Sequence, residues 1–264
     1  KIVVFPELCI TGYTCNDLFL QELLLEKAKE ALLTIAEETG QLETLFLVGL
    51  PVDKDGRLYN VAAVLYRGRI LGMIPKKNIP MYAEFYEGRH FTPGEETVTE
   101  YRLGKQVIPF GSNLLFRCEE LPELILGCEL CEDLWVAEPP STSHALMGAT
   151  VIANLSASNE TVSKDDYRTL LIKASSARLL CGYIYTSAGE GESTQDLVFG
   201  GHDLIAENGT LLVQSARFTT GILYTDLDVL KISSERRRMG TFGKRPMKPY
   251  LTVPFSMQLT GTKL

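Results

Sequence analysis

The sequence has 264 residues, of which 45% are hydrophobic and 22% are charged, and its formal net charge is −7. A chain of this size can bury a large core, as one large domain or two small ones. The acidic balance argues against non-specific binding to nucleic acid or to an anionic membrane, because both require a basic surface. No apolar run approaches the roughly 20 residues that span a bilayer, and no signal-peptide pattern opens the sequence. We therefore expect a soluble, cytoplasmic protein with a small-molecule partner.

The first part of the chain predicts a helix and several strands. After the apolar run Ile2-Val3-Val4-Phe5, Asn16-Asp17 can cap a helix that runs to about Glu38 and stops at Gly40. Strands are expected at residues 44–50, 60–66 and 69–74, with turns at 53–56 and 67–68. A loop rich in charge, glycine and proline follows at 82–94. This order indicates a βα unit followed by a β-meander.

The second part alternates strands and helices again. Strands are expected at residues 123–130, 150–154 and 182–187, and helices near 142–148 and 164–180. A hairpin formed by 201–206 and 210–214 turns at Glu207-Asn208-Gly209, and a further strand is expected at 221–227. Two blocks of mixed sheet, each covered by helices, predict an α/β protein with a four-layer α-β-β-α sandwich.

Three reactive side chains stand where apolar runs end. Cys131 follows the run 124–130 and precedes Glu132-Asp133, Glu7 follows the run 2–5, and Lys76 follows the run 70–74. A thiol on a sharp turn after a strand is placed like a nucleophile, but it needs a base and a cation nearby. Glu7 and Lys76 are the candidates for these two parts.

The other cysteines predict neither disulfides nor a metal site. Six cysteines in 264 residues are too sparse for a secreted disulfide scaffold, and five of them are expected to be small hydrophobic residues. Residues three apart in a strand face opposite sides of the sheet, so Cys128 and Cys131 should not converge unless a turn intervenes. The three histidines are scattered, and no second cysteine pair completes a zinc set. Redox chemistry and metal binding are accordingly disfavoured.

Ordered motifs give the chain a family resemblance. Phe5-Pro6-Glu7, Pro75-Lys76 followed by Ile79, and Cys131-Glu132-Asp133 resemble the Glu-Lys-Cys triad of the nitrilase superfamily. Within it, the chain looks most like the amino-terminal glutaminase domain of glutamine-dependent NAD synthetases. That closer resemblance rests on residues 5–13, 75–87, 131–135, 188–197 and 234–242, and it implies a nitrilase-like sandwich.

The resemblance implies hydrolysis of glutamine to glutamate and ammonia. Cys131 would attack the amide and form a thioester, and Glu7, desolvated at a strand end, would act as general base with a raised pKa. Lys76 would favour the thiolate, with an attraction of about 4 kcal/mol at ~4 Å and an effective dielectric of ~20. It would also stabilise the oxyanion together with the backbone N–H after Cys131. Water activated by Glu7 would then release glutamate.

Each of these residues also has an ordinary interpretation. Taken alone, Glu7 reads as a surface acid, Lys76 as a solvated lysine and Cys131 as a buried thiol. Their joint match to ordered motifs reverses that preference. Lys77 is the alternative to Lys76, but the family's lysine follows a proline and lies three residues before an aliphatic residue, which is Ile79 here.

The resemblance also suggests substrate contacts. Glutamine's polar ends would meet Tyr82, Ser158 and Lys164, while Tyr13 and Phe85 would shape the pocket and Glu132 would orient it. Family members often carry arginine where this chain has Lys164, and a lysine lacks the bidentate fork that suits a carboxylate. A second helpful glutamate is expected beside Lys76, and both Glu84 and Glu87 are candidates.

The expected domain is a single nitrilase-like glutaminase domain over residues 1–264. The resemblance implies a further strand and helix before Phe5-Pro6-Glu7, so we expect the first strand to be lacking. It also implies a carboxyl-terminal synthetase domain that these residues do not contain. No cofactor is expected for glutamine hydrolysis, whereas ATP and Mg would serve only the synthetase domain. That domain and further copies of the chain are the expected protein partners.

Two other functions stay open at this point. A free-standing nitrilase-type amidase would accept amides other than glutamine and would need no synthetase partner. A catalytically silent docking module would bind a synthetase domain without any covalent chemistry at Cys131.

Overall fold

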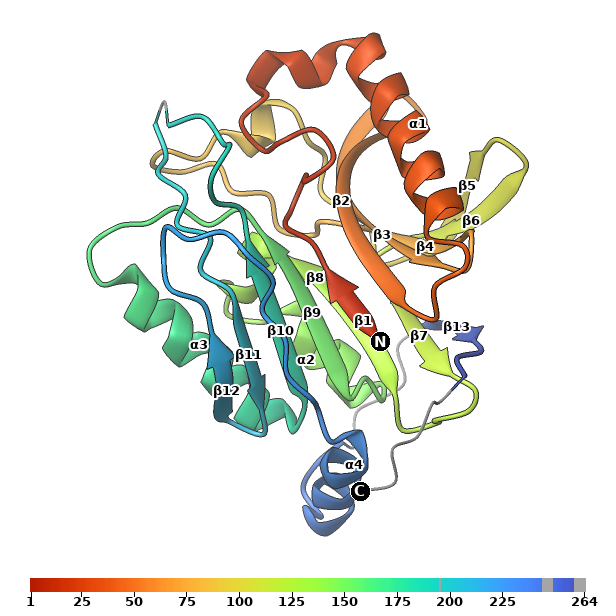
Figure 1. The fold of residues 1–264 in the computed structure, drawn as a ribbon, viewed down its shortest axis with the longest axis vertical. Helices are drawn as coiled ribbons and strands as arrows, with labels where there is room; N and C mark the ends of the chain where they lie inside the picture. Colours follow the sequence, from red (N-terminus) through yellow and green to blue (C-terminus); the bar gives the residue numbers. More distant parts are fainter. Residues whose placement is uncertain (195, 244–248, 259–264) are drawn as a thin grey trace.

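The computed structural model describes residues 1–194, 196–243 and 249–258. Two mixed β-sheets pack face to face, and helices cover their outer faces (Figure 1). This arrangement is the expected α-β-β-α sandwich. No helix among the described residues combines the length and the apolar character that crossing a bilayer requires.

The first sheet contains six strands in the order β1-β2-β3-β4-β6-β5. β1 is parallel to β2, and β2, β3 and β4 form the expected antiparallel meander. Helix α1 (Glu22–Glu38) packs on the outer face of this sheet. The strand bounds are β1 (Ile2–Val4), β2 (Leu45–Lys54), β3 (Arg57–Tyr66), β4 (Arg69–Pro75), β5 (Thr99–Leu103) and β6 (Gln106–Phe110).

The second sheet contains seven strands in the order β12-β11-β10-β9-β8-β7-β13, with β8, β9 and β10 parallel. Its outer face is covered by α2 (Pro140–Leu146) and α3 (Lys164–Leu179), and α4 (Val229–Arg238) lies near one end in Figure 1. The strand bounds are β7 (Leu114–Cys118), β8 (Ile125–Leu130), β9 (Val151–Ser156), β10 (Gly182–Ser187), β11 (Leu204–Glu207), β12 (Thr210–Gln214) and β13 (Leu251–Phe255).

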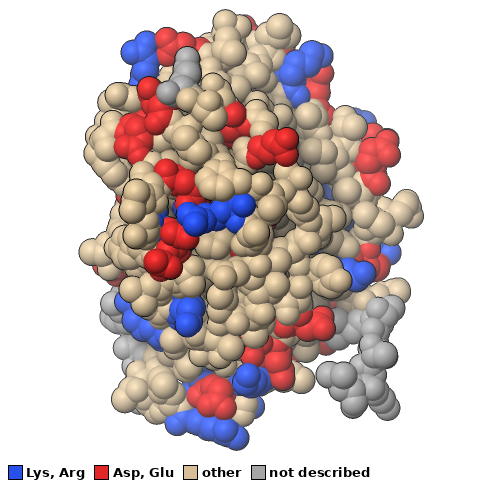
Figure 2. All heavy atoms as spheres, turned by 60° about the vertical axis from the view of Figure 1, so that its left-hand side comes forward, with Lys and Arg blue, Asp and Glu red and all other residues tan. Residues whose placement is uncertain are grey.

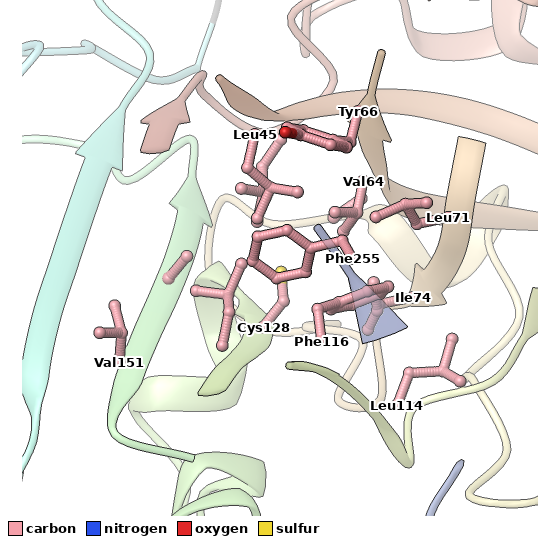
Figure 3. Packing of buried hydrophobic residues seen from close by; sticks show 14 of the residues in the cluster. Leu45, Val64, Tyr66, Leu71, Ile74, Leu114, Phe116, Cys128, Val151 and Phe255 are labelled. Atoms are coloured by element: carbon pink, nitrogen blue, oxygen red, sulfur yellow. The ribbon is translucent and has the colours of Figure 1, made fainter. Parts of the chain in front are cut away.

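The main core lies between the two sheets, where side chains from both interdigitate (Figure 3). Strand β3 shows why its sequence is almost wholly apolar. Ala62 and Val64 point into this core, while Val61 and Ala63 point towards the layer under α1, because successive residues of a strand face opposite sides. Fully burying one large aliphatic or aromatic side chain contributes about 1.5–3 kcal/mol. The core therefore fixes how the ends of the strands meet.

Several expected elements differ in the structure. The helix expected from Asn16 begins only at Glu22, because residues Asn16–Leu20 form a separate 3₁₀ turn, η1, and Gln21 is extended. The expected strand at 221–227 is wrong, since that segment has no regular structure and leaves Ile222 91% exposed. Strands β5, β6, β7 and β13 and helix α4 were not expected from the sequence.

The strand ends of both sheets meet at one edge of the sandwich. Glu7 follows β1 and Lys76 follows β4 in the first sheet, while Cys131 follows β8 in the second. A backbone hydrogen bond from the Glu7 N–H to the Ser156 carbonyl, 3.2 Å long, joins the two sheets at this point. The fold thus gathers residues that are far apart in sequence.

A substitution at Gly49 tests how closely the turn that contains Glu7 packs on β2. A Cβ at Gly49 would lie 2.3 Å from the Leu8 nitrogen and 2.8 Å from the Pro6 oxygen, and both atoms belong to the backbone. We expect Gly49→Ala to displace the turn and to lower the free energy of unfolding by about 1–3 kcal/mol, as measured by urea denaturation. Gly240→Ala is the control, because no atom lies within 4 Å of its Cβ. Equal stability of the two variants would contradict this packing.

Candidate active site

Glu7 is a fully buried carboxylate that three donors hold in place. Its Oε1 atom accepts hydrogen bonds of 2.7 Å from both Lys76 Nζ and Asn60 Nδ2. Its Oε2 atom accepts one of 2.9 Å from the Ala157 N–H. Burial raises the pKa of Glu7 to about 7, although Lys76 acts in the opposite direction. A carboxyl group with this pKa can take up and return a proton near neutral pH.

Lys76 is the cation at the centre of the site. Its fully buried ammonium donates to Glu7 Oε1 at 2.7 Å and to Glu87 Oε1 at 2.6 Å. Burial disfavours the ammonium, but the two carboxylates outweigh this effect and raise the pKa of Lys76 well above its usual value. Lys76 therefore stays charged. An ammonium has three N–H donors, so these contacts leave one for another acceptor.

Glu87, rather than Glu84, is the second glutamate beside Lys76. It lies in the 3₁₀ turn η2 (Glu87–Arg89), is only 5% exposed and also accepts a 2.8 Å hydrogen bond from the Tyr13 hydroxyl. Glu84 instead accepts a hydrogen bond from the Asn159 side-chain amide. The structure thus separates the two candidates that the sequence left open.

Cys131 occupies the expected sharp turn. It is the first residue of the 3₁₀ turn η3 (Cys131–Leu134), and its φ of 40° lies in the left-handed region that non-glycine residues seldom adopt. Its N–H donates to Asn154 Oδ1 at 3.2 Å, and the Asp133 carboxylate accepts a 3.0 Å hydrogen bond from the Leu130 N–H. These side chains hold the backbone in its unusual conformation.

The thiol of Cys131 is neutral in this environment. Burial raises its pKa well above the usual value, and the carboxylate of Glu7 raises it further, whereas Lys76 and the Ala157 N–H lower it. The stabilisation of the thiolate that Lys76 was expected to provide is therefore outweighed. A base must remove the proton when the thiol reacts, and Glu7 is the carboxylate that acts most strongly on the pKa of this thiol.

A cavity of about 350 Å³ opens beside Cys131. Five of the six expected substrate contacts line it, whereas Tyr13 lines a smaller neighbouring cavity of about 60 Å³ behind Glu87. The larger cavity is lined by Tyr82, Ala83, Glu84, Phe85, Cys131, Glu132, Trp135, Ser158, Asn159, Thr161, Val162, Ser163, Lys164 and Tyr167. Its volume suits a small molecule.

Opposite charges line this cavity. Lys164 begins α3, donates a hydrogen bond to Asn159 Oδ1 and has its Nζ 5.1 Å from the centre of the Trp135 ring. Glu132 accepts a 3.0 Å hydrogen bond from the Tyr82 hydroxyl. Burial lowers the pKa of Lys164 and raises that of Glu132. The cavity thus offers both a cation and a carboxylate to a ligand.

A buried arginine supports the cavity wall. Arg168 is fully buried in α3, and its Nη2 atom lies 3.3 Å from Ser158 Oγ and 3.2 Å from the Asn159 carbonyl oxygen. Its Nη1 atom forms a 2.7 Å ion pair with Glu160. Arg168 therefore fixes the loop that presents Ser158 to the cavity.

Sequence reasoning missed the buried amides Asn60 and Asn154. A signal was present, because each interrupts an apolar strand: Asn60 stands next to Val61, and Asn154 stands between Ala153 and Leu155. A polar side chain inside a buried strand must find hydrogen-bond partners, so it often marks a site. Here both partners are site residues, since Asn60 binds Glu7 and Asn154 binds the Cys131 backbone.

Cys128 and Cys131 do not converge. Cys128 packs in the core between the sheets, where burial raises the pKa of its thiol, whereas Cys131 lines the cavity. Within the described ranges, no group of three or more His, Cys, Asp or Glu side chains is arranged to hold a metal ion.

Figure 2 shows acidic and basic side chains interspersed on one face of the molecule.

The profile of the carbon–nitrogen hydrolase family matches residues 1–237. The chain belongs to the carbon–nitrogen hydrolase family. A carbon–nitrogen hydrolase from Helicobacter pylori shares its fold, with a TM-score of 0.71 and 19% identity over 90% of this chain and 81% of that one. These matches confirm the nitrilase-like sandwich.

Two further similarities point to one group within the carbon–nitrogen hydrolases. A glutamine-dependent NAD(+) synthetase from Mycobacterium tuberculosis is 45% identical over 243 residues, which are 91% of this chain and 36% of that protein. The crystal structure of a glutamine-dependent NAD(+) synthetase from Cytophaga hutchinsonii matches with a TM-score of 0.74 and 31% identity, over 82% of this chain and 35% of that one. The chain thus spans little more than a third of the length of these relatives.

Lys76→Met tests which lysine belongs to the site. We expect a loss of at least 10²–10³-fold in hydrolytic rate and a stability loss of about 3–5 kcal/mol, because two buried carboxylates lose their cation. Lys77→Met is the matched control, since Lys77 pairs with Glu96 on the surface and is 36% exposed. Steady-state rates and urea denaturation measure both effects. A larger rate loss in Lys77→Met would reverse the assignment.

Proposed function

We propose that this chain hydrolyses glutamine to glutamate and ammonia through a cysteine thioester, and that the ammonia serves NAD synthesis on a separate synthetase domain. The observation that carries the proposal is the cavity beside Cys131, whose lining holds Glu132 and Lys164 as a pair of opposite charges. Free glutamine carries the matching pair, an α-ammonium and an α-carboxylate. The relatives named above support the choice of glutamine.

In the first half of the reaction, Glu7 takes the thiol proton while the Cys131 sulfur attacks the side-chain amide carbon of glutamine. The amide oxygen becomes an oxyanion. Glu7 then gives its proton to the departing nitrogen, so that the C–N bond breaks and ammonia leaves. The raised pKa of Glu7, about 7, suits both transfers. The product of this half is a thioester on Cys131.

In the second half, Glu7 takes a proton from water, and the resulting hydroxide adds to the thioester carbon. The C–S bond breaks, glutamate is released, and Glu7 returns its proton to the sulfur. Lys76 stabilises the oxyanion in both halves with its third N–H, together with the backbone N–H of Glu132. One such donor typically contributes about 10²–10³-fold in rate.

Recognition of glutamine uses the charges of the cavity. Lys164 and Ser158 bind the α-carboxylate, while Glu132 and Tyr82 bind the α-ammonium. Phe85 packs against the methylene groups. Tyr13 acts indirectly in this scheme, since its hydroxyl binds Glu87 and it lies outside the larger cavity.

We also propose a domain organisation, a cofactor requirement, a location and an assembly state for the chain. Residues 1–264 act as one glutaminase domain, which needs no cofactor because the nucleophile, base and cation are all side chains. ATP and Mg act only on the synthetase domain. The protein works in the cytoplasm, where its six free cysteines stay reduced, and it assembles as a homo-oligomer.

The first test is glutamine hydrolysis by the purified chain. We expect glutamate release that both Cys131→Ala and Glu7→Gln abolish, because the thioester needs the sulfur and the sulfur needs a base. An enzymatic glutamate assay measures release, and mass spectrometry detects the acylated Cys131 peptide. A chain that hydrolyses simple aliphatic amides faster than glutamine would be an amidase. A folded chain with neither release nor acylation would be a docking module.

Lys164→Met tests carboxylate recognition. A hydrogen bond between charged groups contributes about 1.5–3 kcal/mol, so we expect KM for glutamine to rise roughly 10–100-fold, with a smaller change in kcat. Lys164→Arg should keep KM close to that of the unmodified chain. Lys173→Met, on the exposed side of α3, is the control for loss of a positive charge. An unchanged KM in Lys164→Met would remove Lys164 from the substrate contacts.

A further inference from the structure

Asn60 contacts all three charged residues at the base of the site. It lies in β3 and is fully buried. Its side-chain Nδ2 donates to Glu7 Oε1 at 2.7 Å and lies 3.4 Å from Glu87 Oε2. Its backbone carbonyl accepts the Lys76 N–H at 2.8 Å. One residue of the central meander thus connects Glu7, Glu87 and Lys76.

The orientation of the Asn60 amide is determined by charge. An amide nitrogen carries two N–H donors, and the two carboxylates use both of them. The Oδ1 atom is buried and has no hydrogen-bond partner among the described residues. Turning the amide over would place this oxygen against two carboxylates, which is less favourable still. The Oδ1 atom therefore stays without a hydrogen bond, while both N–H groups are directed at Glu7 and Glu87.

The chemistry of an amide suits this position better than a charged group would. With both glutamates ionised, the buried group of Glu7, Glu87 and Lys76 carries one net negative charge. A second cation would favour the ionised form of Glu7 so strongly that it could not hold a proton, while a third carboxylate would compete for Lys76. Asn60 supplies two donors and adds no charge.

We propose that Asn60 is a positioning residue of this site, whose amide keeps Glu7 ionised and turned towards Lys76 so that Glu7 can accept the Cys131 proton. This role deepens the proposed function, on which it rests for the overall reaction. It concerns the reactivity of the thiol, however, and can be tested without glutamine.

The direction of the effect follows from the groups that face Glu7. These are Lys76 at the end of β4, Glu87 in η2, Cys131 in η3, Asn60 in β3, Tyr13 and the Ala157 N–H after β9. A hydrogen bond donated to a carboxylate favours its ionised form and lowers its pKa, so losing the Asn60 donor raises the pKa of Glu7 further above its usual range. The acidic limb of the pH–rate profile for Cys131 alkylation should therefore shift to higher pH by about one unit. Well below the limb, the rate at a given pH falls about tenfold.

The test measures alkylation of Cys131 by iodoacetamide between pH 5 and pH 9, at roughly half-unit steps, in the full 264-residue chain. Mass spectrometry of the Cys131 peptide separates this thiol from the other five cysteines. Asn60→Leu removes both donors and keeps the branched shape and the number of side-chain heavy atoms. Asn113→Leu is the matched control, because Asn113 is also buried but donates to the Pro249 carbonyl rather than to a glutamate.

We expect the limb to move up in Asn60→Leu and to stay in place in Asn113→Leu. If Asn60→Leu does not fold, as judged by circular dichroism, Asn60→Ala removes the same donors without adding bulk and should show the same shift. A folded Asn60 variant whose limb does not move, or whose rate falls equally at every pH, overturns the proposal and leaves Asn60 a structural residue. A shifted limb in a chain that does not hydrolyse glutamine would support the role of Asn60 and refute the glutaminase function.

Discussion

The buried ion cluster of Glu7, Lys76 and Glu87 is the constraint on which the site depends. Removing such ions from water costs several kcal/mol each, and this cost is offset only where the geometry is good and every remaining hydrogen-bonding position is filled. Here the Asn60 amide, the Ala157 N–H and the Tyr13 hydroxyl bind the carboxylate oxygens, and one N–H of Lys76 is left for a further acceptor. The cluster therefore requires both sheets to meet in one arrangement, since its ligands come from both.

The division between the sheets also separates the chemical parts. The first sheet provides the base and the cation at the ends of β1 and β4, whereas the second provides the nucleophile after β8. The Ala157 N–H, which follows β9, contacts the Glu7 carboxylate and also influences the thiol of Cys131. Packing between the sheets is thus what sets the distance between base and nucleophile, and changes in the core between them should be felt at the site.

The sequence predicted the parts of the site that depend on where apolar runs end. Glu7, Lys76 and Cys131 all follow such runs, so their meeting at one edge was foreseeable, whereas the choice of Glu87 over Glu84 depends on how an irregular loop folds back. The strand predictions were wrong where the presence of a neighbouring strand, rather than the amino-acid composition of the segment, decided the structure. β13 contains Pro254, which argues against a strand but is tolerated at a sheet edge. The segment 221–227 has strand-forming residues but no partner strand.

The neutral state of the Cys131 thiol affects how readily this residue is oxidised. Oxidation to sulfenic and higher acids proceeds through the thiolate and increases with exposure. Cys131 is only 5% exposed, and burial together with Glu7 raises the pKa of its thiol, so that little thiolate is present. A permanently ionised cysteine would react faster with oxidants. The carboxylates around the sulfur thus lower the fraction of reactive thiolate and so favour chemical durability between turnovers.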